Sequence, residues 1–289
     1  MLPTFVIGLR EGLEAALIVG IIAAFLARQG RRDALRQVWV GVAAAVAICI
    51  GIAVALQLFE RSLPQRQQEM LETVVGLLAV AMVTGMIIWM RTHARAMKGE
   101  LEGAAAAALA RGSARALVVM AFLAVLREGF ETAVFLLATF QASGNAVTAG
   151  IGAVLGVAVA VALGWGIFHG GVKLNMARFF TLTSALLVLV AAGLVMTAVH
   201  TAHEAGWINV GQAQAADLTW LVRPGTPVAS LLTGVLGIQP TPTVIEVALW
   251  ALYLVPMMIF VLRPAGRPPV KKSVAGQPKE PASAVPSRS

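Results

Sequence analysis

Charged residues are scarce in this chain. Only 12% of its 289 residues are Asp, Glu, Lys or Arg, whereas 58% are hydrophobic. Soluble domains usually carry about 25% charged residues. With a mean hydropathy of +0.83, the chain has too little polar surface to cover a water-soluble globule. The composition therefore excludes an ordinary soluble domain and favours a protein whose solvent is the lipid bilayer.

Cysteine and histidine are also rare. The single cysteine, Cys49, lies in an apolar run, so it predicts neither an intrachain disulfide nor a thiolate metal site, and we interpret it as a small buried hydrophobe. The four histidines form no haem-spaced pair within an apolar run, and no soluble catalytic domain is visible. A membrane oxidoreductase subunit or an assembly scaffold is therefore the less favoured alternative. We expect no cofactor and no enzyme activity.

The positive charge is distributed as in a membrane protein. The net charge is +8, but Arg and Lys cluster in short segments between apolar runs and in the C-terminal tail, which argues against nucleic-acid binding. The first apolar run contains Arg10, Glu11 and Glu14. A cleavable signal peptide does not carry three charges in its apolar region, so we expect this run to be a retained membrane helix.

Seven apolar runs are long enough to cross the bilayer, for which about 20 residues are needed. They are residues 4–27, 38–59, 71–90, 116–140, 147–169, 179–199 and 244–262. The sequence thus predicts an all-α, polytopic membrane domain over residues 1–263. Basic residues concentrate in the first, third and fifth connections and in the tail, which predicts an external N-terminus and a cytoplasmic C-terminus. We expect the plasma membrane, in a bacterium the inner membrane.

Three connecting segments have their own predictions. The alanine-rich stretch 103–109 suggests a short cytoplasmic helix. Residues 264–289 are rich in Pro, Ser and Lys and are expected to form a disordered cytoplasmic tail. The long external connection 200–243 is either a partly ordered lid or a plain connector.

An internal repeat relates the two halves of the chain. Arg-Glu-Gly-Leu-Glu at 10–14 recurs as Arg-Glu-Gly-Phe-Glu at 127–131, and the weaker similarity of Thr84-Gly85-Met86 to Ala192-Gly193-Leu194 lies at matching depth. The repeat units are about 1–92 and 116–201. Because each unit has three spans, the second enters the membrane from the opposite side, which predicts a 3+3 inverted repeat with the seventh helix outside it.

The repeated pentapeptide places charge in the middle of a span. Each ionised group there costs about 2.5–3.5 kcal/mol, so these side chains must pair, line water or bind an ion. Helical spacing puts Arg10, Glu11 and Glu14 on one face, and Gly12 permits close approach of a neighbouring helix. Four carboxylates against two guanidiniums suit a cation, and carboxylate oxygens are hard ligands. The predicted metal ligands are Glu11, Glu14, Glu128 and Glu131, with Arg10 and Arg127 in support. The alternative is a pair of purely structural Arg–Glu clamps.

These pentapeptides resemble the hallmark of the oxidase-dependent iron transporters, the family of fungal high-affinity iron permeases and bacterial iron permeases. Here the first copy is intact and the second has Phe130 where the family often has Leu. The resemblance covers about residues 1–263. It implies an iron permease in which the four glutamates coordinate iron, and an extracytoplasmic partner that oxidises or delivers iron. The external Asp-Ala-Ser-Glu motif of the fungal members is missing.

Two further groups of residues are candidates for a metal-collecting mouth. Glu69 and Glu72 lie one turn apart at the outer end of the third span and are similar to a Glu-x-x-Glu pair of the family, although a helix N-terminus favours acidic residues anyway. His200, His203 and Glu204 share the outer end of the sixth span, where imidazoles can bind iron. Their alternative is a plain polar helix end.

The sequence thus predicts import of iron, as Fe2+ or Fe3+, through a central carboxylate site in a lipid-embedded helical bundle. The alternative within transport is a permease for another cation, such as Mn2+ or Pb2+. The oligomeric state is left open.

Overall fold

The computed structural model describes residues 1–93, 103, 114–143, 146–169, 175–208, 210–222 and 226–263. Within these residues the chain forms eight helices and no strand beyond an isolated bridge. The helices are α1 Leu2–Arg28, α2 Arg32–Arg61, α3 Gln65–His93, α5 Ala114–Ser143, α6 Ala146–Phe168, α7 Met176–Glu204, α8 Pro227–Leu236 and α9 Val244–Leu262. The expected helix at 103–109 and the tail at 264–289 lie outside the described residues, apart from residue 103.

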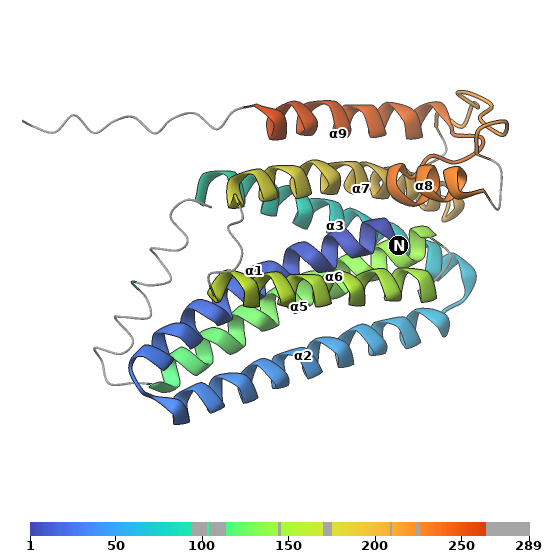
Figure 1. Ribbon diagram of the computed structural model, residues 1–289. Coiled ribbons are helices and arrows are strands. Elements are labelled where there is room, and N and C mark those ends of the chain that lie inside the picture. Colours follow the sequence, from blue (N-terminus) through green and yellow to red (C-terminus); the bar gives the residue numbers. More distant parts are fainter. Residues whose placement is uncertain are drawn as a thin grey trace, which may run out of the picture.

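Seven long helices coincide with the seven predicted spans, which confirms the all-α, polytopic fold (Figure 1). Five of them are apolar and long enough to cross a membrane by length and composition. The other two, α1 and α5, carry the charged pentapeptides near their middle. Large apolar side chains point outward, among them Val40, Val154 and Leu252. Such a surface requires lipid around it, because water would make its exposure unfavourable.

The helix contacts have the symmetry that an inverted repeat predicts. If α1, α2 and α3 correspond to α5, α6 and α7, the contact of α1 with α6 corresponds to that of α5 with α2, and both are found. The contact of α3 with α5 likewise matches that of α7 with α1. The contact of α1 with α2 matches that of α5 with α6, and the contacts of α1 with α5 and of α3 with α7 join corresponding helices of the two units. The two motif helices therefore meet at the centre of the bundle.

The glycine of each pentapeptide lies where a helix of the other unit comes close. A Cβ atom at Gly12 would lie 2.9 Å from Cβ of Ala160 on α6. A Cβ atom at Gly129 would lie 2.6 Å from Sγ of Cys49 on α2. The sequence-based expectation that Gly12 admits a neighbouring helix is thus confirmed, and the equivalent contact appears in the second unit.

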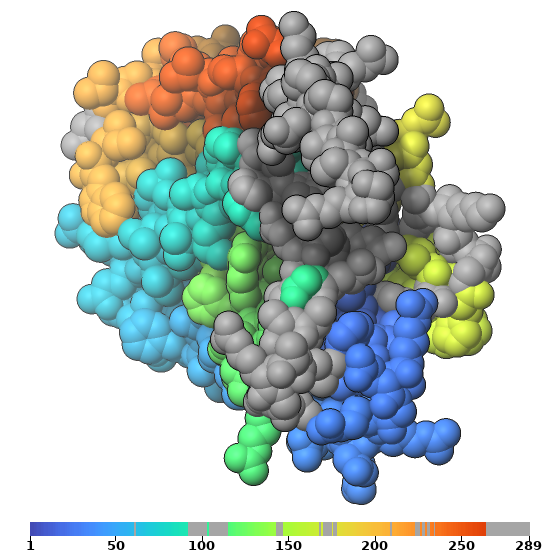
Figure 2. All heavy atoms as spheres, turned by 90° about the vertical axis from the view of Figure 1, so that its left-hand side faces the viewer, coloured from blue at the N-terminus to red at the C-terminus, as the bar shows by residue number. Residues whose placement is uncertain are grey.

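Helix α9 stands outside the repeat. It packs on α7, and its Tyr253 hydroxyl lies 2.8 Å from the Thr84 hydroxyl of α3. Viewed from the end of the bundle opposite the N-terminus, the orange-red atoms of α9 lie at the top of the molecule and the blue atoms of the first two helices at the bottom (Figure 2). Helix α8, from the long connection between α7 and α9, also packs on α7.

Candidate functional site

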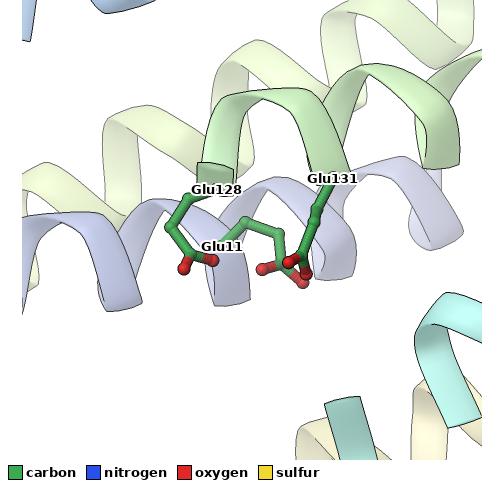
Figure 3. A group of neighbouring side chains, drawn as sticks. All are labelled: Glu11, Glu128 and Glu131. Carbon is green, nitrogen blue, oxygen red and sulfur yellow. The ribbon is translucent and has the colours of Figure 1, made fainter. Parts of the chain in front are cut away.

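Three of the four predicted glutamates come together where α1 and α5 meet. Glu11 extends from α1 toward Glu128 and Glu131 of α5 (Figure 3). One carboxylate oxygen of each residue lies within 4.8 Å of the others, which is the spacing of ligands around one metal ion. Among the described residues, no other group of three or more Asp, Glu, His and Cys side chains converges in this way.

The fourth predicted ligand, Glu14, lies beside this group instead of within it. Its Oε1 is 3.4 Å from Nε of Arg10, the i,i+4 pair that helical spacing predicts. Arg10 Nη1 is also 3.9 Å from Oε1 of Glu11. On α5, Nε of Arg127 is 2.9 Å from Oε1 of Glu131 and 3.9 Å from Oε1 of Glu128. Each arginine thus faces two carboxylates, so the four carboxylates and two guanidiniums together leave two negative charges without a protein cation.

Burial makes the ionised forms of these side chains energetically unfavourable unless they are paired or bind an ion. Arg10 and Glu11 are almost completely enclosed, and Glu14 and Glu128 are buried as well. Within the described part of the chain, both carboxylate oxygens of Glu11, Oε1 of Glu14, Oε2 of Glu128 and all three side-chain nitrogens of Arg10 are buried without a hydrogen-bond partner. Native proteins rarely leave such atoms unsatisfied. These oxygen ligands therefore suit a bound cation and water, because carboxylate oxygens without hydrogen-bond partners are available to coordinate an ion.

The two arginines differ in their surroundings although their motifs are alike. The side chain of Arg10 is 0% exposed, whereas that of Arg127 is 58% exposed. Cζ of Arg127 lies 5.7 Å from the ring centroid of Trp89, near the end of α3. The local motif is symmetric, but the packing around it is not.

This asymmetry predicts unequal effects of two identical substitutions. Arg10→Gln is expected to lower the free energy of unfolding by about 3–5 kcal/mol, because it leaves buried carboxylates without their counter-ion. Arg127→Gln should cost less, because its guanidinium is 58% exposed and its nearest partner, Glu131, is only partly buried, so less buried charge is left unpaired. Thermal unfolding of the two purified variants in detergent measures the difference. Equal destabilisation would show that the burial of Arg10 does not matter.

The predicted mouth residues lie at the start of α3 and the end of α7 and do not converge on one point. Nδ1 of His200 is 3.0 Å from Oε1 of Glu246, and its Nε2 is 3.5 Å from Oε1 of Glu204. Glu246, at the start of α9, is buried and also accepts a hydrogen bond of 2.9 Å from the backbone N–H of Thr243. Sequence reasoning did not identify this partner, because nothing in the local pattern links it to a residue 46 positions earlier.

The other mouth candidates have separate surroundings. Glu69 accepts a hydrogen bond of 3.1 Å from the side-chain amide of Gln65. Glu72 lies close enough to Glu69 and Glu204 for their charges to interact. His203 is half-buried, and its Nε2 has no hydrogen-bond partner among the described residues. Together Glu69, Glu72 and Glu204 place three acidic side chains at the end of the bundle where α3 begins and α7 ends.

A lipid-embedded helical bundle with an inverted repeat and a central carboxylate site defines a membrane permease for cations. The chain matches the model of the Iron permease FTR1 family over residues 1–265. It therefore belongs to that family, as the pentapeptides at 10–14 and 127–131 had indicated.

Curated relatives are similar over nearly their whole length. One is a ferrous iron permease, EfeU, of Escherichia coli O6:K15:H31 (strain 536 / UPEC), which is 42% identical over 277 residues, 95% of this chain and 100% of the relative. Another is the ferrous iron permease EfeU of Yersinia pestis, which is 43% identical over 266 residues, 91% of this chain and 94% of the relative. No solved structure matches the chain.

Proposed function

We propose that this permease imports iron across the plasma membrane and binds the ion between α1 and α5. The observation that carries the proposal is the convergence of Glu11, Glu128 and Glu131 from the two repeat units within 4.8 Å. Three hard oxygen ligands from two oppositely oriented halves form a cation site that neither half has alone. Glu14 is the fourth ligand in the proposal, because its carboxylate lies one turn along the same face of α1.

Charge balance supports Fe2+ as the transported form. Four carboxylates and two guanidiniums leave a formal charge of −2, which a divalent ion neutralises. The relatives described above carry the name ferrous iron permease. Since the charges lie in a medium of low dielectric, neutralisation of the site by the ion is strongly favourable. In this proposal the chain itself performs no covalent chemistry and needs no cofactor.

Transport follows from the inverted repeat. In our proposal the ion sheds part of its water, binds the glutamates, and is then exposed to the other side when the two units rock against each other. In the proposal, Arg10 and Arg127 reduce the repulsion between the carboxylates when no ion is bound. Their i,i+4 pairs lower the cost of the buried charge without neutralising the site completely.

The direction of transport is from outside to cytoplasm in this proposal, with an external N-terminus and a cytoplasmic C-terminus. Iron would first be attracted by the acidic outer ends of α3 and α7. The residues proposed for this role are Glu69, Glu72, His200, His203 and Glu204. An extracytoplasmic protein that oxidises or delivers iron would supply the ion there.

Uptake of radioactive iron into proteoliposomes that contain the purified chain tests the function. We expect uptake of Fe2+ kept reduced with ascorbate, and much slower uptake of Fe3+ presented as citrate. Excess unlabelled Mn2+ or Pb2+ should compete only weakly. Accumulation of manganese or lead without iron would overturn the proposed substrate, and equal rates for both oxidation states would overturn the preference for Fe2+.

A further inference from the structure

Helix α8 turns the connection between α7 and α9 back into the bundle. It contacts α7 and also α1 and α5, the two helices that carry the glutamates. In Figure 1 it lies alongside α7, at the end of the molecule where α1 begins. A simple external connector from α7 to α9 would have no reason to touch α1 or α5. The position of α8 is therefore a specific feature of the fold.

Two independent contacts show how deeply α8 enters. Its C-terminal end contacts Gly193 of α7, which lies about six residues, or ~9 Å, before the end of the predicted span at residue 199. In addition, Nε1 of Trp250 donates a hydrogen bond of 3.1 Å to the carbonyl oxygen of Leu236, and Trp250 lies about two turns into α9. Both contacts lie about 9 Å inside the predicted spans, and half of the hydrocarbon core is about 15 Å thick, so the end of α8 lies within the membrane domain.

The contact with α7 is made by two glycines. A Cβ atom at Gly193 would lie 2.8 Å from the backbone nitrogen of Gly237 and 2.9 Å from the carbonyl carbon of Leu236. Gly237 has φ +66°, and a Cβ atom there would overlap the carbonyl oxygen of Gly193. Only glycine permits this backbone-to-backbone approach. In the first repeat unit, a Cβ atom at the equivalent Gly85 would meet nothing within 4 Å.

Helix α8 is capped by hydrogen bonds at both ends, which lowers the cost of placing helix ends inside a membrane. At its start, the Thr226 hydroxyl accepts a hydrogen bond of 3.2 Å from the N–H of Ala229. At its end, the N–H of Gly237 bonds to the Thr233 carbonyl, and the N–H of Ile238 bonds to the Leu232 carbonyl. This is the pairing of a glycine-capped helix end. Helix α8 is thus a well-formed half-helix.

We propose that α8 is a re-entrant gate, which closes the ion path between the carboxylate site and the side where α1 begins and opens by leaving Gly193. The inference rests on the proposed function, in which iron enters from that side. It assigns the long connection 200–243 a role in transport. Because α8 contacts both motif helices, a change in the relative position of α1 and α5 changes the contacts that hold α8 in place. The Gly193–Gly237 contact and the Trp250 hydrogen bond hold the closed state.

Accessibility of a reporter thiol tests the gate without any use of iron, so its result is independent of whether iron is the substrate. Ile7 is buried on α1 in the core shared with α3, α5 and α7, one turn outward of Glu11 and on the same face. In a Cys49→Ala background, Ile7→Cys should react slowly with a membrane-impermeant cationic thiol reagent added outside. Gly193→Leu should raise the labelling rate of this cysteine about ten-fold or more. The leucine side chain prevents the close contact of α8 with α7, and the open state is only a minor one in the parent protein.

Gly85→Leu is the matched control, since it adds the same side chain at the equivalent position of α3 and should leave the labelling rate unchanged. Trp250→Phe provides a second, milder release of α8 that keeps the aromatic ring, and it should raise the rate by a smaller factor. Trp250→Phe also tests the gate by itself if Gly193→Leu does not reach the membrane. Labelling rates that are equal in Trp250→Phe and the parent, or equal in Gly193→Leu and Gly85→Leu, would overturn the proposal.

Discussion

Glu11→Gln is expected to lower iron uptake by about a hundred-fold or more, since removing one buried charged partner costs about 3 kcal/mol or more and each 1.4 kcal/mol is a factor of ten. The carboxylate of Glu11 is enclosed and has no hydrogen-bond partner in the described part of the chain. It is also the one contribution of α1 to the three-carboxylate group. Glutamine has nearly the same shape, so the change removes charge and one ligand oxygen while it preserves packing.

The same loss is expected for Glu128→Gln, because Glu128 contributes from the other repeat unit. Initial rates of radioactive iron uptake into proteoliposomes measure both variants, with the amount of inserted protein determined in parallel. Asp33→Asn is a suitable control, since it neutralises an exposed carboxylate in the first turn of α2 and should not change the rate. Normal uptake in both glutamine variants would refute the central site.

Gly156→Ala is expected to weaken the folded bundle, although it adds a single methyl group. A Cβ atom at Gly156 would overlap the carbonyl oxygen of Phe5 and lie 2.7 Å from the backbone nitrogen of Leu9. These are backbone atoms of α1, so they cannot rotate away, and α6 must move outward. Overpacking of this kind costs about 1–3 kcal/mol or more and should lower the melting temperature by roughly 5–10 °C.

Gly150→Ala provides the comparison within the same helix. A Cβ atom at Gly150 would meet nothing within 4 Å, and alanine is favoured over glycine in a helix by up to about 1 kcal/mol. This variant should be as stable as the parent or slightly more stable. Thermal unfolding of both proteins in the same detergent gives the answer. If the two substitutions had the same effect, the close contact of α1 with α6 would not contribute to stability.

The inverted repeat and the positions of its charges were largely predictable from local features. An i,i+4 pair of Arg and Glu on a helix needs only helical spacing, and both pairs are present. Gly12 predicted a close helix neighbour for a similar local reason. The partners of these groups on other helices were not predictable in detail. His200 has a buried partner, Glu246, which depends on how α9 lies against α7.

The long connection 200–243 shows the same limit, because its sequence left both a partly ordered lid and a plain connector open. The contacts of α8 with α1, α5 and α7 exist only in the assembled bundle. From the sequence, Gly193 was therefore indistinguishable from Gly85, its equivalent in the repeat. Only the structure shows that the backbone of α8 packs directly on Gly193.

By itself, the sequence determined the class of protein, the seven spans, the repeat and the six charged residues near its centre. It could do so because hydropathy and helical periodicity are properties of neighbouring residues. Only the tertiary structure decided that Glu11, Glu128 and Glu131 converge while Glu14 stays beside Arg10, and that Arg10 is buried while Arg127 is exposed. These differences arise from long-range packing of helices, which places identical motifs in different surroundings.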